Sequence, residues 1–222
     1  MDDFVFCVTG WLFIGAASML WFGWTLLPVR IGPFFESKVF GEVYSRLRLW
    51  IWLYRIHIFG YLVTVMAFAA LAALVVESDS RILVWPAVAV SAAGLIVAAV
   101  AAAFYYHFGA WGAIRMNGQP GSRIQSFLDS LLVGTEYVTC LVRFGRVFFG
   151  LGQVMLAIGL FHGEILPLWL IGGAGVLGLA AIVVTMAFPD NLEYYRPLFH
   201  LNAVWLAGIG IVILTSGIML RG

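Results

Sequence analysis

The sequence has few charged residues and hardly any lysine. Only 10% of its 222 residues are charged, and Lys38 is the single lysine; a typical soluble domain has about a quarter of its residues charged. The hydrophobic share is 63%, which is more apolar surface than a soluble fold of this length can bury. The scarcity of charge therefore excludes an ordinary soluble domain and predicts an integral membrane protein.

Cysteines and catalytic motifs are also scarce. Cys7 and Cys140 are far apart in apolar segments, so we expect free thiols and no disulfide framework or CxxC redox motif. The sequence contains no Walker A loop, G-x-S-x-G elbow or HExxH motif. A net charge of +1 without a basic tail indicates no nucleic-acid partner. These absences leave catalysis uncertain and favour a non-enzymatic role.

Six segments are apolar over the roughly 20 residues that a spanning helix needs. We predict spans at 4–27, 49–76, 82–106, 138–161, 165–188 and 199–220. The first segment has an acidic start and no small-residue cleavage site, so we interpret it as a span and not a signal peptide. The predicted fold is all-α: a polytopic membrane helical bundle that forms a single integral membrane domain over residues 1–222.

The basic residues predict an orientation in the membrane. Ten of the twelve belong to the side that holds the long stretches 28–48 and 107–137, and only Arg81 and Arg221 belong to the other side. By the positive-inside rule the long stretches are cytoplasmic, and both termini lie outside a plasma or inner membrane. Membrane lipids are therefore expected partners of the chain.

The two long stretches resemble each other in pattern. FFESKVFGEVYSRLRLW and SRIQSFLDSLLVGTEYVTCLVRF both place apolar and charged residues at helical spacing, which predicts amphipathic cytoplasmic-side helices leading into spans. Aligning Trp85 with Trp169 also matches several residues that follow each of them. This pattern favours a parallel internal repeat of 36–106 and 124–188.

Polar residues form stripes on two of the predicted helices. Asp129, Glu136 and Arg143 recur every seven residues, which is nearly two helical turns, and Gln153 lies deeper in the same span. On the second span Arg55 stands in an apolar and aromatic run. Arg55, Glu136, Arg143 and Gln153 are the candidate residues for a substrate or ion path. The alternative is that the arginines extend to lipid headgroups and the neutral side chain links helices.

The histidines are the candidate cofactor ligands. His57, His107 and His200 are predicted near the cytoplasmic side, and His162 near the other. Three histidines at one level are candidate ligands for a metal ion, and a pair such as His57 and His107 for a haem b. No two histidines have a metal-binding spacing in sequence, so the cofactor stays unknown.

Three functions fit this sequence. The first is a non-catalytic subunit or scaffold of a larger membrane complex, or a homo-oligomer, held by small-residue faces such as IGGAGVLG at 171–178. The second is a small transporter or channel for an ion or anionic small molecule, with a cavity lined by Arg55, Glu136 and Arg143. The third is a haem- or metal-binding redox subunit. We rank the three functions in that order.

Overall fold

The structure is a computed structural model that describes residues 3–26, 37–75, 78–161, 166–188 and 192–219. Within these ranges the chain is helical and has no strands. The helices are α1 (Asp3–Thr25), α2 (Ser37–Ser45), α3 (Leu47–Leu74), α4 (Ser78–Met116), α5 (Gly121–Leu160), α6 (Leu168–Ala187) and α7 (Leu192–Met219). The segment between the fourth and fifth predicted spans and the beginning of the first long stretch, 28–36, lie outside the described residues.

Among the described residues, six helices are long and apolar enough to cross a membrane, as the sequence predicts: α1 and α3 to α7. Two helices are much longer than the predicted spans: α4, with 39 residues, extends ten residues beyond the predicted end at 106, and α5 begins well before 138. The fourth predicted span is the second half of α5, a single helix of 40 residues that extends for about 60 Å at 1.5 Å per residue. Because the bilayer core is about 30 Å thick, α5 is too long to lie wholly within it unless steeply tilted.

The turn between α4 and α5 is shorter than the sequence suggests. GAIRMNGQPGSR has the composition of a loop, but helix continues to Met116 and resumes at Gly121. Gly118 makes the reversal with a positive φ of 71°, a conformation that glycine adopts without steric cost. Helix persists beyond Gly112 because Ala113 and Met116 are buried against the second hydrophobic cluster described next. Tertiary packing therefore overrides a loop-like composition.

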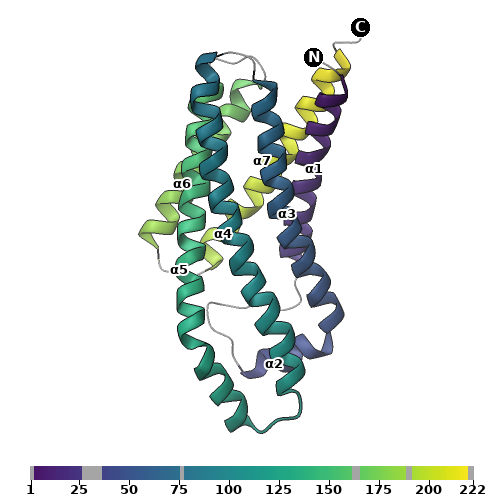
Figure 1. The fold of residues 1–222 in the computed structure, drawn as a ribbon, viewed down its shortest axis with the longest axis vertical. Helices are drawn as coiled ribbons and strands as arrows, with labels where there is room; N and C mark the ends of the chain where they lie inside the picture. Colours follow the sequence, from purple (N-terminus) through teal and green to yellow (C-terminus); the bar gives the residue numbers. More distant parts are fainter. Residues whose placement is uncertain (1–2, 27–36, 76–77, 162–165, 189–191, 220–222) are drawn as a thin grey trace.

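Buried apolar residues form two separate clusters. The first draws residues from α1 and α3 to α7 and forms the core of the spanning bundle. The second is built by α2, α3, α4 and α5, with Phe40, Trp50, Ala110 and Leu131 among its members. Figure 1 shows α4 and α5 reaching well past the ends of α1, α6 and α7 at this second cluster. We call this part, made of α2, the start of α3 and the α4–α5 hairpin, the extension.

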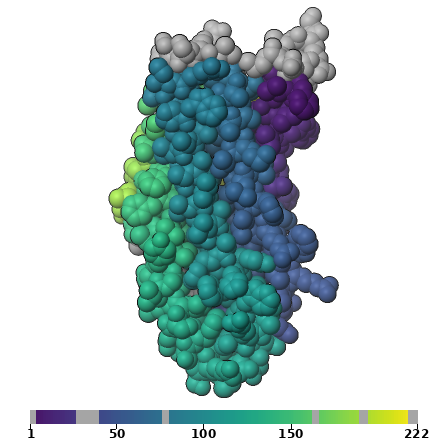
Figure 2. Space-filling view, viewed as in Figure 1, coloured from purple at the N-terminus to yellow at the C-terminus, as the bar shows by residue number. Residues whose placement is uncertain are grey.

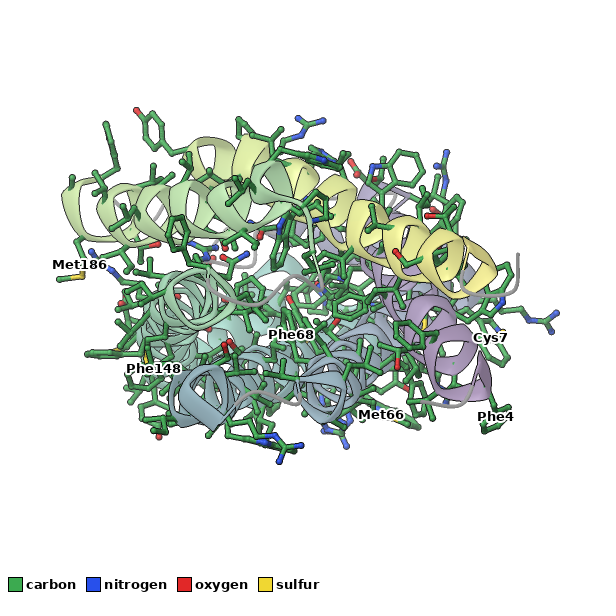
Figure 3. The ribbon with its side chains drawn as sticks, turned by 90° about the horizontal axis from the view of Figure 1, so that it is seen from above. Phe4, Cys7, Met66, Phe68, Phe148 and Met186 are labelled. Carbon is green, nitrogen blue, oxygen red and sulfur yellow. The ribbon has the colours of Figure 1, made fainter. Side chains whose placement is uncertain are left out.

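The outer surface of the bundle is apolar. Between 33% and 44% of the most hydrophobic window of each spanning helix is buried inside the chain, so most of each window faces outward. Phe68 lies among the helices, whereas Phe4, Met66, Phe148 and Met186 point away from them (Figure 3). On the face shown in Figure 2, α3, α4 and α5 form one continuous surface. Such outward apolar faces are those of a bundle surrounded by lipid.

Glycines set the close crossings of the spanning helices. A Cβ atom on Gly94 would lie 2.5 Å from the carbonyl oxygen of Gly145 in α5, and one on Gly10 would lie 2.9 Å from that of Gly210 in α7. Gly150 and Gly178 face each other in the same way between α5 and α6. These glycines therefore pack inside this chain, because helices approach closely where no side chain intervenes.

The first α1 residues and the last α7 residues lie at one end of the molecule, and the α4–α5 turn lies at the other (Figure 1). This arrangement is compatible with the predicted topology. The side of the membrane on which each end lies, the amphipathic role of α2 and the parallel repeat remain predictions.

Candidate functional site

A cavity of about 170 Å³ lies between the two hydrophobic clusters. Its walls come from α1, α3, α4, α5 and α7. Leu95, Phe149 and Leu206 belong to the first cluster, and Tyr54 and Ala102 belong to the second. The cavity is therefore placed where the spanning bundle meets the extension.

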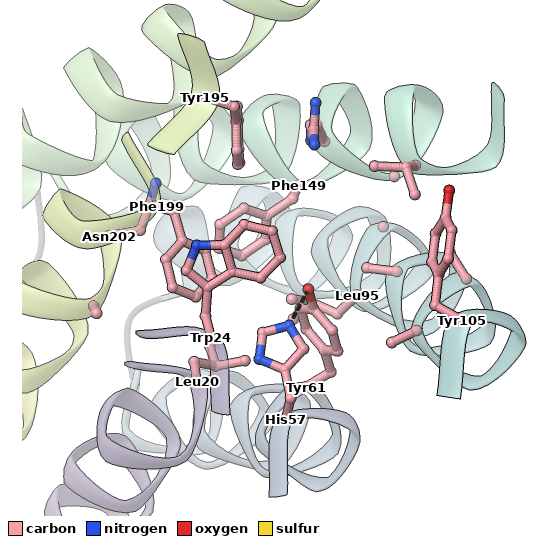
Figure 4. Close-up of a pocket in the computed structure, with 18 of the residues that line it drawn as sticks. Leu20, Trp24, His57, Tyr61, Leu95, Tyr105, Phe149, Tyr195, Phe199 and Asn202 are labelled. Atoms are coloured by element: carbon pink, nitrogen blue, oxygen red, sulfur yellow. Dashed lines mark hydrogen bonds between the residues drawn. The ribbon is translucent and has the colours of Figure 1, made fainter. Parts of the chain in front are cut away.

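Aromatic rings make up much of the wall. Trp24 of α1 lies with its ring centroid 5.4 Å from Phe199 of α7 and 6.0 Å from His57 of α3. The rings of His57 and Phe199 are 5.9 Å apart. Figure 4 shows these side chains together, with Phe149, Tyr61 and Tyr195 nearby. Three helices distant in sequence thus supply one aromatic surface.

His57 is fixed within this wall. Only 4% of its surface is exposed, and α1 approaches so closely that a Cβ atom on Gly23 would lie 2.7 Å from the His57 Cβ. Its Nε2 shares a hydrogen bond of 2.9 Å with the Tyr61 hydroxyl. Its Nδ1 has no hydrogen-bond partner among the described residues. The histidine therefore presents a hydrogen-bonded ring to the cavity from a rigid position.

A buried amide pair links α5 to α7 beside the cavity. Gln153 Nε2 donates to Asn202 Oδ1 at 2.6 Å, and Asn202 Nδ2 donates to the carbonyl oxygen of Leu198 at 2.9 Å. Gln153 is fully buried, and its Oε1 has no partner in the described part of the chain. Asn202 lines the cavity, whereas Gln153 lies behind it. The predicted path residue Gln153 thus supports the wall through a partner that sequence patterns did not identify.

Two arginines of α5 point to different helices. Arg146 lines the cavity and stacks over the ring of Tyr195, with its guanidinium carbon 4.3 Å from the ring centroid. Arg143 is outside the cavity lining and donates to the backbone carbonyl of Thr185 in α6 at 3.1 Å. Arg196 of α7 is a second cationic residue of the lining.

The other predicted path residues do not line this cavity. Arg55 is exposed, donates to the Tyr106 hydroxyl at 3.2 Å and lies over the ring of Trp52. Glu136 is exposed on α5. The structure does not bring Arg55, Glu136 and Arg143 together around the cavity, and a path through them stays a prediction.

The predicted histidine ligands are not assembled with one another. His107 is exposed and contacts Phe108 and Trp111, and His200 is half-buried beside Phe199. Of the three, only His57 lines the cavity. No three His, Cys, Asp or Glu side chains lie close enough to hold a metal ion in the residues that the structure describes, and His162 is outside these residues. Their role as ligands of a haem or metal stays a prediction.

Several wall residues carry no sequence signal of their own. Trp24, Tyr61 and Phe199 look like ordinary residues of membrane-boundary aromatic belts. Asn202 is the exception, because an amide in an apolar span is a recognisable feature. Comparison of the chain with protein-family models, curated proteins and solved structures finds no match, so its geometry is the guide to its function.

Proposed function

We propose that this chain is an integral membrane protein that binds a small, mainly apolar molecule in the cavity between its spanning bundle and its extension, as a small transporter would. The observation that carries this proposal is the cavity itself, which has aromatic walls and a few convergent polar groups. Pockets for small molecules have this composition. A bare ion is disfavoured as the occupant, because most of the lining is apolar or aromatic and would not replace the hydration shell of an ion.

The size of the cavity limits its occupant. An engineered apolar cavity of about 150 Å³ takes up benzene, whereas drug-sized ligands need about 300–1,000 Å³. A cavity of about 170 Å³ therefore holds one ring or a few methylene groups. A larger amphipathic molecule would place only one end inside and leave the rest between the helices or in lipid.

The position of the cavity favours uptake from the bilayer boundary. Trp24 lies at the end of α1, and Tyr195 lies in the first turn of the described part of α7. These helix ends fall near one face of the bundle in Figure 1. We propose that this is the cytoplasmic face, because the basic residues favour that orientation.

We also propose a second role, as a subunit of a larger membrane complex. The glycine crossings give it little support, because Gly94, Gly150 and Gly178 pack within the chain. The extension supports it better. Large apolar side chains are exposed there beyond the ends of α1, α6 and α7, including Trp52, Trp111, Leu132, Val133 and Tyr137. Exposed patches of this kind often mark interaction surfaces.

A matched pair of α4 variants tests the cavity. Ala98 lines it, whereas Ala103 is exposed on the same helix. We expect fluorobenzene to give a saturable bound ¹⁹F signal with the wild-type protein in lipid nanodiscs. Ala98→Phe should abolish that signal because the added ring fills the cavity, and Ala103→Phe should preserve it. The measurement is a ¹⁹F NMR titration against empty nanodiscs.

The same titration can refute the proposal. A wild-type protein that gives no signal beyond that of empty nanodiscs would contradict it. So would a saturable signal that Ala98→Phe leaves unchanged while that variant remains folded.

A further inference from the structure

We infer that the occupant of the cavity carries a single uncharged planar ring with hydrogen-bond acceptors, which is the chemistry of a lipid-soluble quinone. This inference rests on the proposed binding function and specifies its ligand. It follows from the shape of the wall, from the hydrogen-bonding character of its polar groups and from its charge.

The wall favours a ring over a flexible chain. The rings of Trp24, His57 and Phe199 lie with their centroids 5.4–6.0 Å apart, and the Tyr61 ring lies 4.7 Å from that of His57. Offset-stacked and edge-to-face contacts add stability beyond simple burial when the guest is itself a planar ring. An acyl chain gains only burial from the same surface, and it loses rotational freedom.

The polar groups of the wall are mainly donors. Arg146 and Arg196 offer only N–H groups, five on each guanidinium, so each can serve a ligand in addition to its protein contacts. The amide of Asn202 already uses its Oδ1 as acceptor and its Nδ2 as donor within the protein. Tyr54, Tyr105 and Tyr195, whose hydroxyls can both donate and accept, also line the cavity. A ligand with carbonyl oxygens complements this set better than a ligand that only donates.

The charge of the cavity lining also limits which ligands can bind. The lining residues in the described part of the chain include no Asp or Glu, so an ammonium group would have no counter-charge and would face two arginines. A carboxylate would have to leave water and enter a largely apolar cavity whose two arginines already make contacts within the protein. That transfer costs several kcal/mol unless the charge is fully paired. A neutral ring with carbonyl groups avoids both costs and dissolves in the bilayer from which it would enter.

Duroquinone and durene form a matched pair of test ligands. Both are tetramethylated six-membered rings, but only duroquinone has carbonyl oxygens. We expect duroquinone to displace bound fluorobenzene from the wild-type protein with about tenfold higher affinity than durene, after correction for partitioning into nanodisc lipid. A factor of this size corresponds to one hydrogen bond from a charged donor. The measurement is competition against the ¹⁹F signal.

Two arginine variants locate the donor. Arg146→Met should reduce the preference for duroquinone to near unity, and Arg123→Met should leave it unchanged, because Arg123 is exposed near the α4–α5 turn and donates to Gln119. Equal affinities of the two ligands for the wild-type protein would overturn the inference while leaving the proposed binding function in place. Failure of fluorobenzene to bind would instead contradict the proposed function itself.

Discussion

Replacing Gly178 with alanine is expected to destabilise the folded protein by about 1–3 kcal/mol, the usual cost of overpacking a close contact. A Cβ atom there would collide with the carbonyl oxygen of Gly150 and lie 3.0 Å from the Cβ of Gln153. The obstacle is largely backbone, which cannot rotate away, so α5 and α6 must separate. The measurement is thermal unfolding of the purified variant, followed by the fraction that remains monodisperse in detergent.

Gly172 provides the control on the same helix. A Cβ atom there would meet nothing within 4 Å, so Gly172→Ala should leave stability unchanged or raise it by up to about 1 kcal/mol through better helix propensity. If the two alanine variants unfold at the same temperature, α5 and α6 do not cross at Gly178 as described.

The second large effect is expected at the buried amide pair. Asn202→Leu removes the acceptor for Gln153 Nε2, and because Gln153 Oε1 already has no partner in the described residues, the buried amide is left unsatisfied at both ends. We expect a loss of about 2 kcal/mol, since an unpaired buried polar group costs about 1–3 kcal/mol. The measurement is again thermal unfolding in detergent.

The double variant Gln153→Leu with Asn202→Leu distinguishes hydrogen bonding from packing. Replacing both partners with apolar residues of similar size removes the unsatisfied amide, so the double variant should be more stable than Asn202→Leu alone. If the stability lost in the double variant equals the sum of the losses in Gln153→Leu and Asn202→Leu, the two amides do not interact. The α5–α7 contact beside the cavity is then not formed by them.

The fold could be predicted because each membrane span is encoded by one continuous apolar segment of the sequence. Each of the six runs supplies its own apolar length, and backbone hydrogen bonds within a helix need no distant partner. The ends of α4 and α5 could not be predicted in the same way. Ala113 and Met116 belong to a loop-like sequence, and they become helical because they are buried in a cluster with residues of α2, α3 and α5.

The candidate site was predictable only in part. His57 and Gln153 stand out because polar groups in apolar spans are costly and usually have a structural or functional role, and both lie at or beside the cavity. Arg143 has the same sequence signal as Arg146, three residues later, but only Arg146 lines the cavity. That difference depends on the rotation of α5 against α6 and α7, which no local pattern specifies.

The aromatic wall could not be predicted from the sequence for a related reason. Trp24, Tyr61 and Phe199 come from three helices, and each alone resembles an interfacial or core residue. They become one surface only because Gly23 lets α1 approach His57 and α7 packs against α1. The cavity is therefore a property of helix crossings, and its ligand preference follows from the residues that those crossings bring together.

Photolabelling with a small phenyl diazirine in nanodiscs, followed by mapping of the labelled residues, tests most directly whether a ring enters this cavity. The account predicts saturable labelling of cavity residues such as Tyr61, Phe149 and Phe199, and protection of those residues by excess fluorobenzene. Labelling confined to outward-facing residues such as Phe59, Ile96 and Val100, without protection, would contradict it.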